Sequence, residues 1–194
     1  MFPSRRVTMG GDVFRNEYSL EFDGTNDYID LGASLSLGTG DFTISIWAKH
    51  TTWGDSHQYL ISQYADTNNR WYFRVQSGSP PRFQLYTKIG GSESGQNGFY
   101  GVPTNEPLLS NLNNQWVNFC LSSDRDGQNR GYINAVFNDD DSGSTATMDN
   151  GGNIEIAKHS TARFGGGISE VVLYDKALSS SEVATIYNGR EPYN

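Results

Sequence analysis

Aromatic side chains are the residues of this sequence with the clearest potential for ligand chemistry. They make up 13% of the 194 residues and include 4 Trp and 11 Tyr. Aromatic rings stack on the apolar faces of sugars, while Asn, Asp and Arg bind the sugar hydroxyl groups. Trp53 and Tyr100 lie in turn-rich segments and are the ligand-binding candidates that we expect at the surface. Trp47 and Trp71 complete the candidate set, against the alternative that most of these aromatic residues pack in a core.

Residues for nucleophilic or metal-assisted catalysis do not occur in a recognisable order. The sequence has no Ser-His-Asp order, Gly-rich phosphate loop or His-x-His pair. His50, His57 and His159 are separate and lie among polar residues, so we expect them at the surface. The three aspartates at 139–141 offer oxygen ligands for calcium, but no Glu follows at the spacing of a calcium-binding loop. A solvated acidic turn is the simpler interpretation.

Composition and charge exclude several classes of partner. The formal net charge of −8 argues against nucleic acid, because binders of phosphate backbones need clustered Lys and Arg. No stretch is apolar enough for membrane insertion, and residues 1–17 lack the apolar run of a secretory signal. Cys120 is the one cysteine, so no intrachain disulfide can form, and its apolar neighbours predict a packed thiol.

Period-two alternation of apolar and polar residues dominates the chain and predicts β-strands. The clearest case is 42–49, in which Phe42, Ile44, Ile46 and Ala48 share one face that we expect to be core. Short runs separated by turn residues are typical of an antiparallel sandwich or barrel. Similar runs occur at 18–22, 28–31, 59–63, 71–76, 83–87, 116–122, 132–137, 154–157 and 168–174.

One helix is predicted, near the end of the chain. Ser179 and Glu182 form a Ser-x-x-Glu capping box, and Gly189 is the expected stop after one or two turns. We expect residues 1–17 to be an N-terminal arm, 18–190 a single domain and 191–194 a tail. Residues 88–114 are rich in Gly, Ser, Asn and Pro and are expected to form a long, ordered contact loop.

Four segments resemble one known family when they are taken in order. They are 19–31 (SLEFDGTNDYIDL) with 42–49 (FTISIWAK), 116–117 (WV), 131–134 (GYIN) and 164–179 (FGGGISEVVLYDKALS). This sequence of motifs resembles laminin G-like domains of the concanavalin A-like lectin and glucanase group. The resemblance implies an all-β fold, an antiparallel β-sandwich of the concanavalin A-like jelly-roll type with one short C-terminal helix.

The resemblance also implies a place for calcium, although no cofactor is required for folding of a chain this long. Relatives hold a structural calcium between the first strand and the closing strand, which points to Asp23 and Ser169 here. The usual Asp of the closing strand is replaced by Ser169, which removes one charged ligand. The alternative is that Asp23 caps its turn by accepting hydrogen bonds from backbone amides.

Glycoside hydrolases of this fold carry alternating carboxylates on one strand, and that pattern is missing here. Glu21 and Asp23 come closest, but a turn follows them at once. We therefore expect no enzymatic activity.

Two roles remain for a domain of this kind. The first is a bacteriophage virion protein, a capsid decoration or tail-associated component, located in the virion. Its partners would be other virion proteins or itself as a homo-oligomer, with contacts to surface glycans. A domain of a secreted type without a signal sequence or disulfide motivates this prediction, because virion proteins assemble in the host cytoplasm. The alternative is a secreted carbohydrate-binding or cell-adhesion module, located outside the cell.

Overall fold

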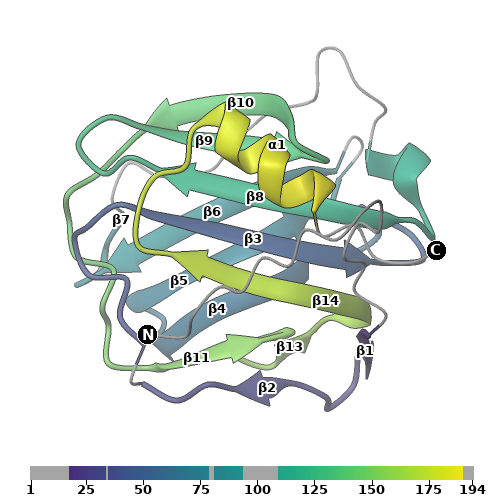
Figure 1. Ribbon diagram of the computed structural model, residues 1–194. Helices are drawn as coiled ribbons and strands as arrows, with labels where there is room; N and C mark the ends of the chain where they lie inside the picture. Colours follow the sequence, from purple (N-terminus) through teal and green to yellow (C-terminus); the bar gives the residue numbers. More distant parts are fainter. Residues whose placement is uncertain (1–17, 34, 79–80, 94–108, 190–194) are drawn as a thin grey trace.

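Two antiparallel sheets packed face to face form the protein, as Figure 1 shows. The computed structural model describes residues 18–33, 35–78, 81–93 and 109–189. The predicted arm and tail lie outside the described residues, as do Tyr100 and most of the predicted contact loop. The antiparallel sandwich with one C-terminal helix is as predicted.

Sheet A has six strands in the order β1-β14-β3-β8-β9-β10. Its edges are therefore β1 and β10. The strands are β1 (Leu20–Asp23), β14 (Gly165–Tyr174), β3 (Phe42–Lys49), β8 (Trp116–Ser123), β9 (Gln128–Ile133) and β10 (Val136–Ser142).

Sheet B also has six strands, in the order β2-β11-β4-β5-β6-β7. A small hairpin, β12 with β13, packs against β4. The strands are β2 (Ile29–Asp30), β11 (Asn153–Ile156), β4 (Gln58–Asp66), β5 (Asn69–Gln76), β6 (Arg82–Ile89), β7 (Ser92–Glu93), β12 (Lys158–His159) and β13 (Ala162–Arg163). A short 3-10 helix, η1 (Leu109–Leu112), precedes β8.

The core lies between the two sheets and confirms the predicted inward face of β3. Side chains at alternate positions of β3 are at most 2% exposed, and those of β5 meet them from the other sheet. Alternation places every second side chain of a strand on the same face. The inward residues are Phe42, Ile44, Ile46 and Ala48 of β3 and Trp71, Phe73 and Val75 of β5.

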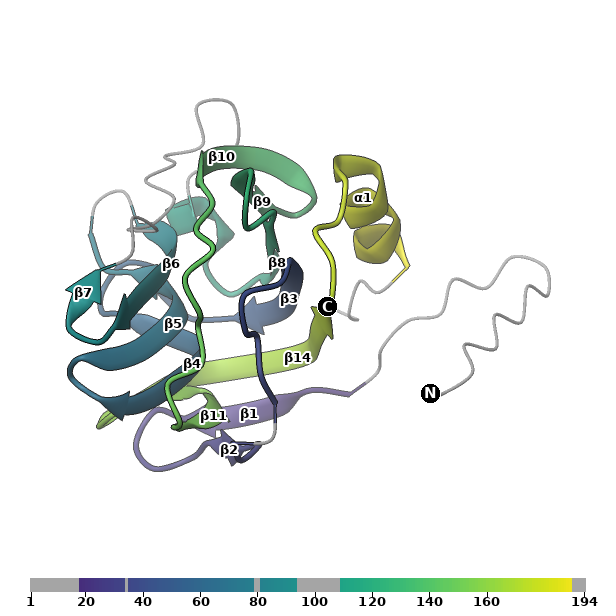
Figure 2. The same cartoon turned by 90° about the vertical axis from the view of Figure 1, so that its left-hand side faces the viewer.

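Helix α1 (Ser180–Asn188) packs on the outer face of sheet A, so that sheet A lies between α1 and sheet B (Figure 2). The predicted capping box is present, with Ser179 as N-cap and Glu182 as its partner. Val183 packs from the helix onto Cys120 of β8, whose thiol is buried as predicted. Burial raises the pKa of this thiol to about 12, which keeps it protonated. Nine residues make α1 longer than the predicted one or two turns.

Three local predictions were wrong. Residues 132–137 are not one strand, because Asn134 and Ala135 form a turn with φ of 51° and 61° and divide the run between β9 and β10. The aspartates at 139–141 belong to strand β10 rather than to a turn, and charged residues on such an edge strand oppose pairing with another chain. His50 and His159 are buried, 9% and 8% exposed, rather than at the surface.

Among the described residues, no helix is long and apolar enough to cross a membrane.

Candidate functional site

The structure places three of the predicted ligand-binding aromatic residues in the interior. Trp71 is 0% exposed on the inner face of β5, where its Nε1 donates to Oε1 of Gln63 at 3.0 Å. Trp53 is 2% exposed and packs edge-on against Phe119 of the core. Neither ring offers a face on which a sugar could stack.

Trp47 points outward from sheet A, as its position in the alternation requires, but α1 covers it. Its ring stacks on Tyr187 with centroids 5.2 Å apart, and 2% of the residue is exposed. The assignment of Trp47, Trp53 and Trp71 to sugar stacking is therefore corrected, since packing already covers all three rings.

Asp23 and Ser169 do not come together, so the calcium site inferred from the resemblance does not fit. In the ladder of β1 with β14, Asp23 pairs with Gly165, whereas Ser169 lies four residues further along β14. That offset is about 13 Å at the rise of an antiparallel strand, too far for one ion. Ser169 Oγ instead donates to the carbonyl of Tyr18 at 2.9 Å.

Asp23 has the alternative role, that of capping its turn. Its Oδ1 accepts hydrogen bonds from the amides of Thr25 at 2.7 Å and Asn26 at 3.1 Å. These amide donors hold the pKa of the Asp23 carboxyl below its usual value.

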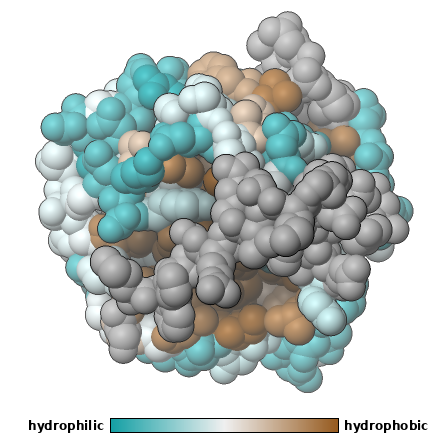
Figure 3. All heavy atoms as spheres, viewed as in Figure 1, coloured by the Kyte–Doolittle hydropathy of each residue, from teal (hydrophilic) through white to brown (hydrophobic). Residues whose placement is uncertain are grey.

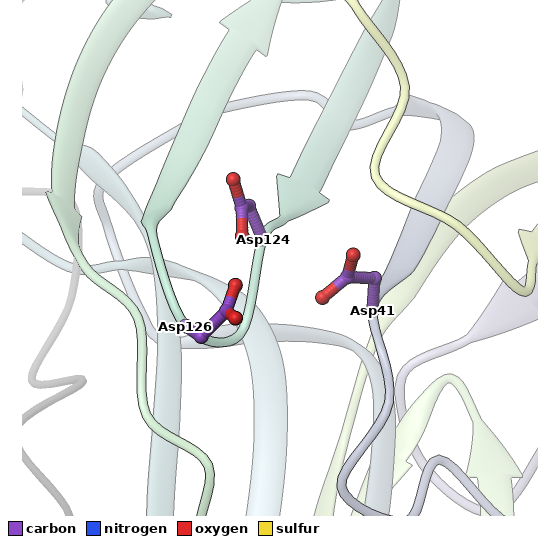
Figure 4. Close-up of side chains that lie close together, drawn as sticks. All are labelled: Asp41, Asp124 and Asp126. Atoms are coloured by element: carbon purple, nitrogen blue, oxygen red, sulfur yellow. The ribbon is translucent and has the colours of Figure 1, made fainter.

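A different group of carboxylates lies at the end of sheet A. Asp41 precedes β3, and Asp124 and Asp126 stand on the turn from β8 to β9 (Figure 4). Their oxygen atoms lie within 4.8 Å of one another. Asp41 Oδ1 already accepts from the amide of Arg125 at 2.9 Å. The hydrogen bond with Asp126, burial, and the nearby charges of Asp41 and Asp126 raise the pKa of Asp124. Acidic groups at the surface are common without a bound ion, and we assign no ligand to this one.

The outer face of sheet B carries a second, larger group of side chains, which we name the tyrosine–arginine face. Its side chains stand at alternate positions of β5 and β6, opposite to the core residues of the same strands. On β4, a register shift between Tyr59 and Ile61 brings Tyr59 and Tyr64 to this same face. They are Tyr59, Tyr64, Arg70, Tyr72, Arg74, Gln84, Tyr86 and Lys88.

Strand register aligns these side chains in rows across the sheet. Tyr64, Arg70 and Lys88 form one row, in which Tyr64 pairs with Arg70 and Arg70 with Lys88. In the next row, Tyr72 pairs with Tyr86, and their rings stack with centroids 4.8 Å apart at 10°. Cross-strand neighbours of this kind contact one another directly.

The third row is Tyr59, Arg74 and Gln84. The Arg74 guanidinium lies 4.7 Å from the centroid of the Tyr72 ring and 5.5 Å from that of Tyr59, within the range of cation–π attraction. Its Nε donates to Oε1 of Gln84 at 2.9 Å, and its Nη1 donates to the Tyr59 hydroxyl at 3.0 Å. Arg74 is therefore held rigidly at the centre of the face.

The β12–β13 hairpin closes one side of the face with His159. The imidazole stacks on the Tyr59 ring at 4.7 Å and meets the Tyr72 ring edge-on at 4.6 Å. A hydrogen bond of 2.7 Å from Ser62 Oγ to the carbonyl of Lys158 fixes the hairpin to β4. Among the described residues, His159 Nδ1 is buried without a hydrogen-bond partner.

Burial and positive charge shift the pKa values of this face. Burial, followed by the charges of Arg70 and Arg74, lowers the pKa of His159 to about 4, so the imidazole is neutral near pH 7. Burial raises the pKa of the Tyr72 hydroxyl to about 12. The face therefore presents neutral rings together with guanidinium and ammonium charges.

Residues 23–184 match the sequence profile of the Concanavalin A-like lectin/glucanases superfamily. The chain belongs to this superfamily. No curated protein matches the sequence.

Solved structures share the concanavalin A-like fold of this chain at low sequence identity. A native heptameric SAP-like pentraxin from Limulus polyphemus is 17% identical with a TM-score of 0.65, over 87% of this chain and 81% of that chain. Domain 4 of AbnA, a GH43 extracellular arabinanase from Geobacillus stearothermophilus, is 19% identical with a TM-score of 0.63, over 87% and 76%. The receptor binding domain of botulinum neurotoxin D is 15% identical with a TM-score of 0.65, over 88% and 43%. At these low identities the similarity shows a common fold only, so the function of this chain has to be argued from its own residues.

Sequence reasoning missed the tyrosine–arginine face of this concanavalin A-like domain, although a signal was present. In β5, Arg70, Tyr72 and Arg74 alternate with the core residues, as Gln84 and Tyr86 do in β6. The Trp residues predicted to bind a ligand are buried instead, because a sandwich of this size packs its largest rings in the interior. Tyrosines and arginines on alternate outward positions of β5 and β6 were the signal of this face.

Proposed function

We propose that this domain is a non-catalytic glycan-binding module and that the tyrosine–arginine face contacts the glycan. The observation that carries the proposal is the row structure of this face, in which aromatic rings alternate with Arg, Lys and Gln on paired strands. Rings supply apolar stacking surface, and the polar groups supply directed hydrogen bonds. Domain 4 of AbnA, which shares the fold, was solved in complex with arabinotriose, and this is consistent with the proposal.

The rim of the face is its accessible part. Tyr64, Arg70, Tyr86 and Lys88 are partly exposed, whereas Tyr72 and Arg74 are 6% and 8% exposed and form the floor. A ligand would therefore contact the rim side chains directly. The floor residues would affect binding through the positive charge of Arg74 and through the shape that they give to the face.

We propose that the domain binds the glycan without hydrolysing it. On β5, the central strand of the face, the outward positions hold Arg70, Tyr72 and Arg74 rather than the alternating carboxylates of a glycosidase. Glu155, at one side, contacts Lys158, and Glu93, at the other, accepts from the Tyr86 hydroxyl at 2.8 Å. Side chains that bind without donating or removing protons suit a binding module.

Binding to a panel of immobilised glycans, followed by titration calorimetry on the positive members, tests the proposal. We expect Tyr86→Ala to weaken binding by about tenfold, because it removes a rim ring. Phe137→Ala is the matched control, since Phe137 is an exposed ring on β10 of the other sheet. No cofactor is proposed, so calcium and chelator should give equal affinities. Binding to no glycan, or equal losses in both variants, would overturn the proposal.

We propose a virion role as a second candidate, supported by an apolar groove at the open side of the sandwich. The groove measures about 270 Å³ and lies between the edge strands β1 and β2. Hydrophobic atoms gather on the lower part of this side in Figure 3. Leu20 and Leu31, near the edges, are 56% and 42% exposed. Unpaired edges beside exposed apolar surface favour self-association.

In this candidate role, a second copy of the chain covers the groove, and the oligomer serves a phage virion as a capsid decoration or tail-associated protein. Light scattering of the purified protein should then give a dimer or larger assembly, and Leu20→Lys should shift it to the monomer. Leu35→Lys, a substitution of another exposed leucine, is the control. A wild-type monomer at all concentrations would contradict the assembly role and would leave the glycan proposal standing.

A further inference from the structure

We propose that the glycan bound by the tyrosine–arginine face is acidic, and that its carboxylate or sulfate groups pair with Arg70 and Lys88 above the buried guanidinium of Arg74. This inference rests on the proposed glycan-binding function and adds the chemical class of the ligand to it.

Positive charge is concentrated on this face of an otherwise acidic chain. The sequence has 14 Lys and Arg against 22 Asp and Glu, a formal net charge of −8. Arg70 and Lys88 are direct partners in the ladder of β5 with β6, and Arg74 stands on the same face of β5. Adjacent like charges repel one another, so a structure without a use for them tends not to place them side by side.

Within the described residues, no carboxylate forms an ion pair with Arg70, Arg74 or Lys88. The ion pairs of the described residues are His50 with Asp55, Lys158 with Glu155, and Lys176 with Glu182, and none includes Arg70, Arg74 or Lys88. The nearest carboxylates are Asp66, whose pKa is lowered mainly by hydrogen bonds and also by the charge of Arg70, and Glu93, the ladder partner of Lys88. Asp66 accepts hydrogen bonds from Asn68 and Asn69, and Glu93 accepts from the Tyr86 hydroxyl. Cations whose neighbouring carboxylates bind other groups are complementary to an anion from outside.

Arg74 provides the strongest part of the argument, because its charge is buried. The residue is 8% exposed, and its two hydrogen-bond partners, Gln84 and Tyr59, are neutral. Removing a charge from water without pairing it costs free energy. A carboxylate or sulfate held above the floor recovers part of that cost, so the unpaired guanidinium favours an acidic ligand over a neutral one.

Arg70 has the geometry for direct contact with such an anion. Its guanidinium lies 5.5 Å from the centroid of the Tyr86 ring, and its Nη1 donates to the carbonyl of Thr67 at 2.6 Å. Among the described residues, its Nε is buried without a hydrogen-bond partner, so an anion from outside would meet the Nη donors. Guanidinium donors form paired, charge-assisted hydrogen bonds with carboxylate and sulfate oxygens. The ring of Tyr86 beside it can stack on the sugar that carries the anion.

The test compares acidic polysaccharides with neutral counterparts of the same backbone. Titration calorimetry at 150 mM NaCl would use polygalacturonate against its methyl ester for the carboxylate, and dextran sulfate against dextran for the sulfate. We expect at least one acidic member to bind about tenfold or more tightly than its neutral counterpart, with affinity that falls as salt rises. The pair that discriminates identifies the anion.

Matched arginine variants locate the binding. Arg70→Gln should remove most of the preference for the acidic member, and Arg70→Lys should restore part of it. Arg130→Gln, on sheet A, controls for a general loss of positive charge. Thermal denaturation of each variant establishes that it is folded.

The possible results separate this inference from the function on which it rests. Equal binding of acidic and neutral members, or an equal effect of Arg70→Gln and Arg130→Gln, would overturn the inference and leave glycan binding intact. Failure of the panel as a whole, acidic and neutral alike, would overturn both.

Discussion

The guanidinium of Arg74 lies 4.7 Å from the centroid of the Tyr72 ring, at the centre of the outer face of sheet B. The contact joins a buried cation to a ring that itself stacks on Tyr86, which is partly exposed. Floor and rim of the tyrosine–arginine face are thus one packed unit. A change in the floor is therefore expected to alter the rim and the binding that depends on it.

Replacement of Arg74 by Met should separate function from stability. The variant removes a buried charge that has no carboxylate partner among the described residues, but it also leaves Gln84 without its donor. These effects oppose each other, so the free energy of unfolding should stay within about 1 kcal/mol of wild type. Affinity for an acidic glycan should nevertheless fall. Urea denaturation and calorimetry measure the two quantities.

A second buried arginine is the control for this experiment. Arg125 is 3% exposed and donates to the carbonyls of Ser144 and Ala146, both at 2.5 Å. Its replacement by Met leaves both carbonyls without this donor, and we expect a loss of roughly 2–3 kcal/mol with glycan binding unchanged. Equal destabilisation by Arg74→Met and Arg125→Met would show that Arg74 has a mainly structural role.

His159 should make the fold sensitive to mild acid. Burial and the charges of Arg70 and Arg74 hold its pKa at about 4 in the folded state, against 6.5 in an unfolded chain. Between these values the unfolded state binds a proton that the folded state does not, so the free energy of unfolding decreases as pH falls from 6.5 to 4. The full effect is about 3 kcal/mol.

The variant His159→Phe isolates this effect, because it keeps a ring against Tyr59 and cannot be protonated. Denaturation from pH 7 to pH 4 should show a shallower loss of stability in the variant than in wild type. His57→Gln is the comparison. His57 is more exposed than His159, and partial desolvation together with Arg74 lowers its pKa in the same direction, so we expect a smaller change in the pH profile. Parallel pH profiles for wild type and His159→Phe would refute the assignment.

Much of the fold could be predicted from sequence because its signals are local. Alternation in 42–49 identified the core face of β3, and Ser179 with Glu182 identified the start of α1. Each signal depends on residues a few positions apart. The turn at Asn134 was missed, because apolar residues stand on both sides of it and no Asn-Gly pair marks it.

The candidate site could not be predicted in the same way, because it depends on contacts between distant segments. Trp47 loses its exposed face to Tyr187, a residue 140 positions later in the chain. The rows of the tyrosine–arginine face depend on register, and the ladder of β4 with β5 shifts between Tyr59 and Ile61 and again between Tyr64 and Asp66. Bulges of this kind redirect side chains without a clear sequence signal.

Asp124→Asn should stabilise the protein at pH 7. The raised pKa of Asp124 means that its ionised form is disfavoured beside Asp126 and Asp41, so a neutral side chain removes repulsion. The melting temperature should rise at pH 7, and the difference from wild type should disappear at pH 3, where the carboxyl is protonated. Asp140→Asn, an exposed aspartate of β10, should change little. A fall in melting temperature at pH 7 would show that Asp124 has a favourable partner.

Ser179→Ala should loosen α1, the only α-helix among the described residues, and so test how α1 is held on sheet A. The Ser179 side chain accepts from the amide of Glu182, and the Glu182 carboxylate accepts from the amide of Ser179 at 2.9 Å. Loss of an N-cap costs about 1 kcal/mol, so the urea midpoint should fall without a change in m-value. Ser181→Ala lies within the first turn and removes the contact of its Oγ with Ser179 Oγ at 3.1 Å, but it keeps both hydrogen bonds of the capping box. The capping role fails if both variants lose equal stability, or if Ser179→Ala unfolds with the wild-type midpoint.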